Sequence, residues 1–130
     1  MSENQNKRIR LLLVDDEKGF VDIISKRMSK RNIDVTKAYS GTDALQALRK
    51  ADFDVVVLDL KMEGMDGIEI LKLFKKIVPD LAVIMLTGHG SEEAARDGIN
   101  FGAFDYLTKP CDLEELVAKI KEAYRQQKRN

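Results

Sequence analysis

Three aspartates of this chain, Asp15, Asp16 and Asp59, each stand at or just after the end of a run of apolar residues. Adjacent carboxylates such as those of Asp15 and Asp16 repel each other, and burial removes their favourable hydration. A divalent cation would offset both costs. Mg²⁺ prefers hard oxygen ligands and is often held by one or two carboxylates together with a phosphate. If the three aspartates meet in space, they therefore predict a site for Mg²⁺.

Thr87 and Lys109 also follow apolar runs, in the segments VIMLTGHG and DYLTKP. A hydroxyl and an ammonium group suit the oxygens of a phosphoryl group, since the hydroxyl donates a hydrogen bond and the ammonium supplies positive charge. A carboxylate can act as the nucleophile and form an acyl phosphate. The carboxylates, the hydroxyl and the ammonium together predict transfer of a phosphoryl group to an aspartate, provided that the fold gathers them.

Short apolar runs rich in β-branched residues alternate with segments of helical periodicity along the chain. We expect strands at residues 9–14, 34–38, 55–58, 82–86 and 104–107. Three of these runs are nearly all apolar, which is typical of parallel strands covered on both faces. Five strand–helix units in this length predict an α/β fold: a doubly wound, flavodoxin-like, five-stranded parallel sheet in the order 2-1-3-4-5, with five helices.

The expected helices are marked by apolar stripes and by capping residues. We expect the first helix to bury one stripe of apolar side chains: Phe20, Ile23, Ile24 and Met28. Ser40 is a plausible N-cap of the second helix, and Asp66 suits the turn ahead of the third. The fourth helix, residues 91–101, is the weakest, because it contains Gly98, which costs about 1 kcal/mol relative to alanine in a helix interior.

The predicted topology would bring the five polar residues to one edge of the sheet. In doubly wound sheets the ligand lies at the carboxyl ends of the strands, at the switch point between strands 1 and 3. Asp15 and Asp16 follow strand 1 and Asp59 follows strand 3, and neighbouring strands lie about 4.8 Å apart. Thr87 and Lys109 follow strands 4 and 5 at the same edge.

Charge and composition limit the classes of function. The 22 basic and 22 acidic residues give a net charge of zero, which argues against a general nucleic-acid or anionic-membrane surface. The single cysteine cannot form an internal disulfide, and no apolar run approaches the roughly 20 residues that span a bilayer. We therefore expect a cytoplasmic single domain, with residues 1–7 disordered and residues 127–130 as a C-terminal tail.

The order of these residues along the chain resembles the receiver domain of two-component response regulators, the CheY-like domains. The matching positions are Asp15–Asp16, Asp59, Thr87 and Lys109–Pro110, each at a strand end and in the same chain order. The resemblance covers residues 8–126. It implies a signalling domain rather than an enzyme, one that promotes only its own Mg²⁺-dependent phosphorylation and dephosphorylation.

The resemblance also implies a role for each acidic residue. Asp59 would accept a phosphoryl group from a phosphohistidine on a partner. Asp16, Asp59 and the backbone carbonyl of Lys61 would bind Mg²⁺ directly, and Asp15 would act through a metal-bound water.

The remaining site residues would hold or sense the phosphoryl group. Lys109 would pair with its oxygens, and the Lys109–Pro110 peptide bond would be cis. Thr87 would turn to donate a hydrogen bond to the group, and Tyr106 would swing inward behind it. Lys61 and His89, each two residues past a site residue, would tune the rate of hydrolysis.

The resemblance implies partners as well. The phosphoryl donor would be a sensor histidine kinase or a histidine phosphotransfer protein. Phosphorylation would change the face made by helix 4, strand 5 and helix 5, and this face would control an unknown output domain or protein or form a phosphorylation-dependent homodimer. Direct contact with nucleic acid or with a membrane is not expected.

Three other functions fit the sequence less well. A phosphatase of the haloacid-dehalogenase type needs a second acid two residues after its nucleophile, where this chain has Lys61. A nucleotide or flavin binder lacks the G-x-x-x-x-G-K-[ST] loop, and acids at the switch point would repel its phosphate without a metal. A degenerate receiver that serves only as an interaction module is not supported, because every key position is filled.

Overall fold

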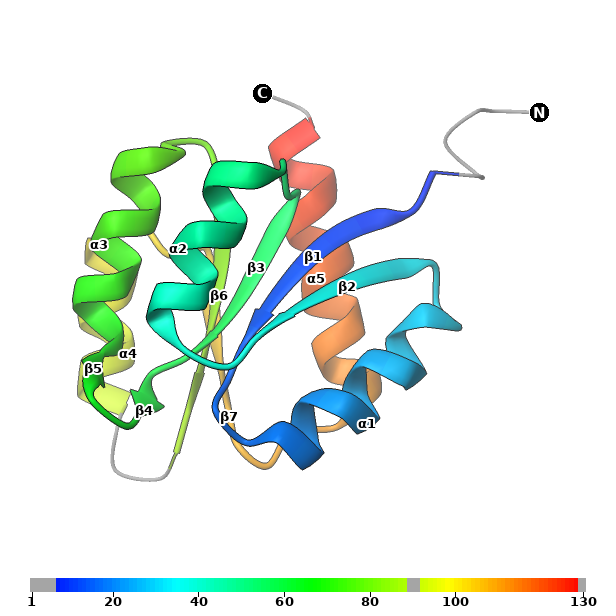
Figure 1. The fold of residues 1–130 in the computed structure, drawn as a ribbon, viewed down its shortest axis with the longest axis horizontal. Coiled ribbons are helices and arrows are strands. Elements are labelled where there is room, and N and C mark those ends of the chain that lie inside the picture. The colour runs from blue at the N-terminus through cyan, green and yellow to red at the C-terminus, as the bar shows by residue number, and fades with distance from the viewer. Residues whose placement is uncertain (1–6, 89–91, 129–130) are drawn as a thin grey trace.

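The structure, a computed structural model, describes residues 7–88 and 92–128. In chain order its elements are β1 (Ile9–Val14), α1 (Lys18–Ser29), β2 (Ile33–Ala38), α2 (Gly41–Lys50), β3 (Val55–Asp59), β4 (Lys61–Met62), β5 (Met65–Asp66), α3 (Gly67–Ile77), β6 (Ala82–Thr87), α4 (Glu92–Asn100), β7 (Asp105–Thr108) and α5 (Leu113–Lys128). Five strands form one parallel sheet in the order β2-β1-β3-β6-β7 (Figure 1). The predicted flavodoxin-like topology is confirmed.

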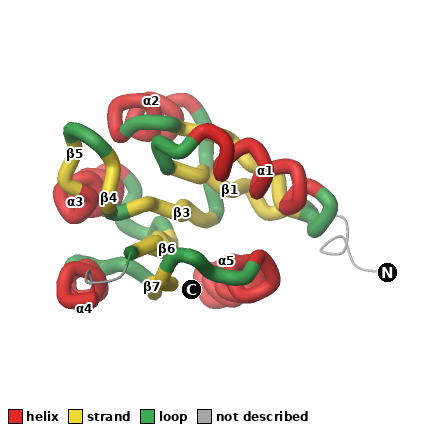
Figure 2. Tube along the Cα trace, turned by 90° about the horizontal axis from the view of Figure 1, so that it is seen from below, coloured by secondary structure: helices red, strands yellow, loops and turns green. Residues whose placement is uncertain are grey.

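The sheet is covered on both faces, which explains the nearly continuous apolar strands. Successive strand residues point to opposite faces. Leu12 and Val56 pack in one core cluster with side chains of α2, α3 and α4, and Leu11 and Val57 pack in another with side chains of α1 and α5. Figure 2 shows the two helical layers on either side of the strands. All four of these side chains are fully buried, so the middle of these two central strands leaves no room for a polar side chain on either face.

Strand ends differ from the prediction by a residue at several places. β2 begins one residue earlier than predicted, at Ile33. β3 and β6 end one residue later, at Asp59 and Thr87, and β7 is shifted by one residue to Asp105–Thr108. A further element was not predicted: β4 and β5 pair antiparallel in a small hairpin whose turn contains Gly64 at a φ of 76°. Two-residue strands are too short to show an alternating pattern, so sequence periodicity could not reveal them.

Two helix starts follow the capping residues. The Ser40 hydroxyl accepts a hydrogen bond from the Asp43 N–H at 3.1 Å, and the Asp66 carboxylate accepts one from the Ile68 N–H at 2.9 Å. Both side chains satisfy backbone donors that a helix cannot satisfy within itself. In the described ranges, no helix is both long enough and apolar enough to cross a membrane.

The buried stripe of α1 is shifted from the predicted one. Val21, Ser25 and Met28 are buried, and Phe20 and Ile24 are partly buried. Another predicted member, Ile23, is 54% exposed, so its assignment to the core was wrong. At about 100° per residue, position 23 lies on the far side of the helix from positions 21 and 25.

The small residues of α4 allow it to lie close to the sheet. Ala95 and Gly98 are buried against it. A Cβ atom added to Gly98 would lie 2.2 Å from the Met85 Sδ atom of β6. The glycine that weakens this helix locally is therefore the residue that permits its packing.

We expect Gly67→Ala to destabilise the domain by about 1–3 kcal/mol, because overpacking forces a shift of neighbouring atoms. An added Cβ would lie 2.7 Å from the Leu60 Cα and 2.9 Å from its carbonyl oxygen, and backbone atoms cannot move aside cheaply. Gly19→Ala is the matched control, since a Cβ on Gly19 meets nothing within 4 Å. Urea denaturation of both variants measures the difference. Equal midpoints would contradict the close approach of α3 to Leu60.

Candidate functional site

The polar residues singled out in the sequence lie at the carboxyl ends of the central strands. Val14 pairs with Leu58 across β1 and β3, so Asp15 and Asp59 emerge side by side. These ends meet at the lower edge of the sheet in Figure 1. Parallel strands all end at the same edge, and the side chains that follow them are no longer covered by helices.

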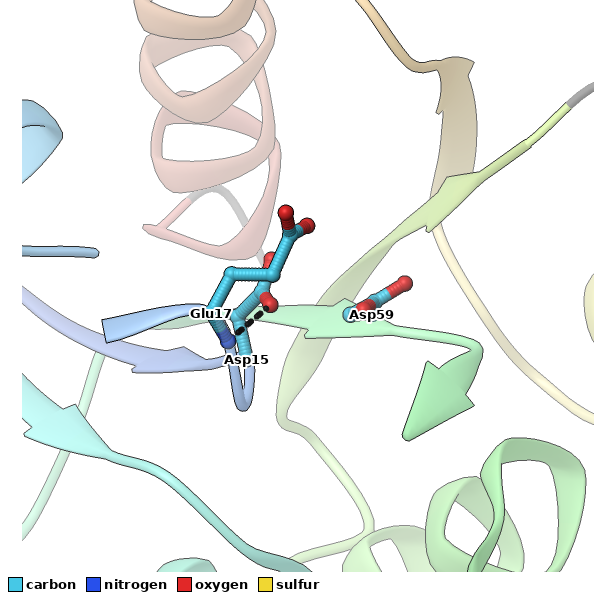
Figure 3. A group of neighbouring side chains, drawn as sticks. All are labelled: Asp15, Glu17 and Asp59. Atoms are coloured by element: carbon cyan, nitrogen blue, oxygen red, sulfur yellow. Dashed lines mark hydrogen bonds between the residues drawn. The ribbon is translucent and has the colours of Figure 1, made fainter. Parts of the chain in front are cut away.

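Three carboxylates converge at this edge, and they are not the three that were predicted. One oxygen from each of Asp15, Glu17 and Asp59 lies within 4.8 Å of the other two (Figure 3). Asp15 and Asp59 are buried, whereas Glu17 is exposed. The donor set consists of hard anionic oxygens, which suits Mg²⁺ or another hard divalent cation. Glu17 was missed because nothing in its sequence position distinguishes it from an ordinary acid at the start of a helix.

Asp16 lies beside this group and outside it. Its carboxylate accepts a hydrogen bond from the Glu63 N–H at 3.0 Å, which ties the loop after β1 to the β4–β5 hairpin. Asp16 was expected in the cluster and lies outside the three converging carboxylates, while its role as a metal ligand stays a prediction. Asp16 still acts on the cluster through space, because its charge raises the pKa of Asp59.

Lys109 supplies the positive charge of the site. Its Nζ atom lies 2.7 Å from an Asp15 oxygen, 2.7 Å from a Glu17 oxygen and 3.7 Å from an Asp59 oxygen. Burial lowers the pKa of Lys109, but hydrogen bonds to Asp15 and Glu17 outweigh that effect and leave the pKa above its ordinary value. The Lys109–Pro110 peptide bond is cis. Lys109 therefore keeps its positive charge at all physiological pH values and lies beside the three carboxylates.

Asp59 combines burial with an unfavourable charge environment. The residue is 4% exposed, and desolvation is the main cause that raises its pKa from 3.8 to about 6. A hydrogen bond from the Lys61 N–H, 3.1 Å from the Asp59 Oδ1 atom, and the Lys109 charge oppose the rise, while Asp15 and Asp16 add to it. Asp59 is thus an ionised carboxylate above pH 6 whose charge is poorly solvated, which is a favourable state for a nucleophile or a metal ligand.

Thr87 is fully buried, and its hydroxyl has no hydrogen-bond partner among residues 7–88 and 92–128. It follows Leu86, which pairs with Asp59 across β3 and β6. Leaving a hydroxyl buried and unpaired costs about 1–3 kcal/mol. The geometry therefore leaves a hydrogen-bond donor available next to the Asp59 strand end.

The remaining predicted residues fall in different surroundings. Tyr106 is partly buried and packs against the core cluster on the α2–α3–α4 face of the sheet. Lys61 has an exposed side chain, and its backbone N–H is the group that contacts Asp59. His89, which was expected to tune hydrolysis, lies outside the described residues.

Comparison with known proteins agrees with this geometry. Residues 11–121 match the family model described as response regulator receiver domain. The chain is 36% identical over 121 residues to the transcriptional regulatory protein GlrR of Escherichia coli (strain K12), covering 93% of this chain and 27% of that protein. The chain thus spans about a quarter of the length of the curated relatives it matches.

Solved structures show the same similarity. A response regulator receiver domain protein from Clostridium thermocellum superposes with a TM-score of 0.88 at 35% identity, covering 92% of this chain and 97% of that one. A CheY-like receiver domain protein from Methanospirillum hungatei JF-1 has a TM-score of 0.89 at 29% identity, covering 95% of this chain and 98% of that one. Both likenesses extend over nearly the whole of each molecule.

Proposed function

The chain belongs to the response regulator receiver domain family of signalling domains, and from this we propose that it is a switch operated by phosphorylation of Asp59. The observation that carries the proposal is the combination around Asp59: a buried carboxylate, a cation at 3.7 Å, and an unpaired buried hydroxyl on the neighbouring strand. We assign the receiver unit to residues 8–126.

The reaction is a phosphoryl transfer to a carboxylate. An Asp59 oxygen attacks the phosphorus of a phosphohistidine, the new O–P bond forms as the N–P bond breaks, and the electron pair of the broken bond stays on the imidazole nitrogen. Above pH 6 Asp59 is mainly ionised and needs no general base. The product is an acyl phosphate, whose oxygens carry nearly two negative charges.

Mg²⁺ fits the oxygen donors at this edge. Asp16, Asp59 and the Lys61 carbonyl would hold it, with Asp15 acting through a bound water. When bound, the ion neutralises the crowded carboxylates and the oxygens of the incoming group. Two of these residues, Asp15 and Asp59, belong to the group of converging carboxylate oxygens, and the Asp16 charge acts on Asp59 through space, which supports the fit.

Lys109 and Thr87 would receive the other phosphoryl oxygens. Lys109 already carries its proton, so it contributes charge without a proton transfer. The Thr87 hydroxyl, which has no hydrogen-bond partner in the part of the chain that the structure describes, would gain one. Movement of Thr87 would leave room for Tyr106 to turn inward, and the face of α4, β7 and α5 would report the change.

The partners follow from this chemistry. The donor is a protein with a phosphorylated histidine, a sensor kinase or a phosphotransfer protein. The relative GlrR is a transcriptional regulatory protein in which the matched region is a minor part, which supports control of an output domain or protein. The α4–β7–α5 face is the proposed contact surface for that output. A phosphorylation-dependent homodimer through the same face and a cytoplasmic location belong to the proposal.

Intact mass after incubation with acetyl phosphate tests the proposal. We expect a gain of one phosphoryl group in the presence of Mg²⁺, no gain with excess chelator, and no gain in Asp59→Asn, because an amide cannot accept the group. Asp66→Asn is the matched control, since Asn caps a helix as well as Asp does and residue 66 lies outside the site. Phosphorylation of the Asp59→Asn variant, or none in the unmodified protein, would contradict the assignment.

A further inference from the structure

The Glu17 side chain does not serve helix α1, although Glu17 stands at the start of that helix. It is the N-cap residue of α1, yet its side chain makes no capping hydrogen bond. Its backbone is fixed, because the Glu17 N–H donates to the Asp15 carboxylate at 3.0 Å (Figure 3). Its carboxylate reaches instead to the Lys109 Nζ atom, at 2.7 Å. Residues 92 positions apart in the sequence are joined by this contact.

The contacts of Lys109 are distributed unevenly. On the α1 side its ammonium group donates to Asp15 and Glu17 at 2.7 Å each, and it lies 4.6 Å from the centre of the Phe20 ring. On the other side the nearest Asp59 oxygen is 3.7 Å away, which is beyond hydrogen-bond distance. In the resting site Lys109 is therefore drawn toward α1 and away from the residue that accepts the phosphoryl group.

We propose that Glu17 is a positioning residue that holds Lys109 on the α1 side and competes with the phosphoryl group for its charge. The inference rests on the proposed function, since it assumes that Asp59 is the acceptor. Among residues 7–88 and 92–128, Lys109 is the only basic residue within ion-pair distance of Asp59. A phosphoryl group on Asp59 must take this ammonium from Glu17, or share it with Glu17. Glu17 thereby lowers the stability of the phosphorylated state.

The size of the effect follows from exposure. The Glu17 side chain is 65% exposed and the Lys109 side chain 19% exposed, so solvent screens part of the attraction. An ion pair with one exposed partner contributes little to the free energy of the state that contains it. Its loss therefore changes the binding constant of the phosphoryl analogue by about two- to fivefold. Asp15, by contrast, is fully buried, and its contact with Lys109 serves the resting fold. Glu17 is thus the partner that Lys109 can release at low cost.

The test uses the phosphoryl analogue trifluoroberyllate, titrated into the full chain at saturating Mg²⁺ and followed by NMR. We expect Glu17→Gln to tighten binding about two- to fivefold, because the variant keeps the length of the side chain and removes its charge. Glu63→Gln is the matched control: Glu63 is another exposed acid near the site, and it should leave binding unchanged. Without metal or analogue, ¹³C relaxation at the Lys109 Cε atom should show larger side-chain motion in Glu17→Gln.

Each outcome bears on one proposal. If the unmodified protein does not bind trifluoroberyllate with Mg²⁺, the proposed function fails. If it binds, and Glu17→Gln binds equally or more weakly, only the role of Glu17 is overturned. If Glu63→Gln tightened binding equally, the effect would come from the lower negative charge of the protein in general, and the role of Glu17 would again be overturned. A loss of Mg²⁺ affinity of roughly tenfold or more in Glu17→Gln would make Glu17 part of the metal site instead.

Discussion

Lys109→Met should lower the free energy of unfolding by about 2–4 kcal/mol at pH 7.5 in metal-free buffer, because removal of one member of a buried ion pair leaves the other uncompensated. Asp15 is fully buried and Asp59 is 4% exposed, and both lose the cation that offsets their charge. The value lies somewhat below that of a fully buried pair because the Lys109 side chain is 19% exposed. Urea denaturation measures the difference.

The loss should depend on pH and on Mg²⁺. The Lys109 charge lowers the pKa of Asp59, so without Lys109 that pKa rises further above 6. At pH 5 Asp59 then carries a proton in the folded state and no longer needs a cation, so the defect should shrink. Saturating Mg²⁺ should also recover part of the stability, because it binds the folded state alone and supplies positive charge at the same place.

Lys119→Met is the control for a lysine between two acids at the surface. Lys119 pairs with Asp105 and Glu122, whose side chains are 36% and 45% exposed. Its removal should cost at most about 1 kcal/mol. A Lys109→Met defect that matched this control, or that was the same at pH 5 and pH 7.5, would show that the acidic group does not depend on Lys109.

The strand ends of the site could be predicted because they follow from periodicity. Asp15, Asp59 and Thr87 are each the first polar residue after an apolar run, and a covered parallel sheet excludes polar side chains until its strands end. The doubly wound topology then brings those ends together without any knowledge of side-chain contacts. For the same reason the order of the strands was correct although several ends differed by a residue.

Features set by tertiary contacts could not be predicted in this way. The choice between Asp16 and Glu17 depends on how the chain turns between β1 and α1: one carboxylate bonds to the Glu63 N–H and the other to Lys109. The need for a glycine at position 98 arises from the Met85 side chain of β6, which packs against it. Neither partner is visible in the local pattern of charge or hydrophobicity, so the sequence identified the types of group in the site better than their contacts.

Asp59→Asn should raise the free energy of unfolding of the metal-free domain by about 1–3 kcal/mol at pH 7.5, since each pKa unit corresponds to about 1.4 kcal/mol. The folded state raises the pKa of Asp59 from 3.8 to about 6, so it disfavours the ionised form. The favourable contribution of Asp59 is present below pH 4 and is lost as the pH rises through 6. An asparagine has no charge to desolvate, and its carbonyl oxygen can still accept the Lys61 N–H.

The pH dependence separates this effect from a general change in packing. The advantage of Asp59→Asn should be largest at pH 7.5 and should shrink at pH 4.5, where Asp59 of the unmodified protein is protonated in the folded state. Asp66→Asn, which keeps its cap, should match the unmodified protein at both values. Mg²⁺ should stabilise the unmodified protein and stabilise Asp59→Asn less, because a metal ligand is missing. A variant less stable than the unmodified protein at pH 7.5 would mean that the 3.7 Å attraction to Lys109 outweighs desolvation. In the predicted case, the proposed phosphoacceptor Asp59 destabilises the resting fold, and a bound cation relieves that cost by supplying positive charge beside its carboxylate.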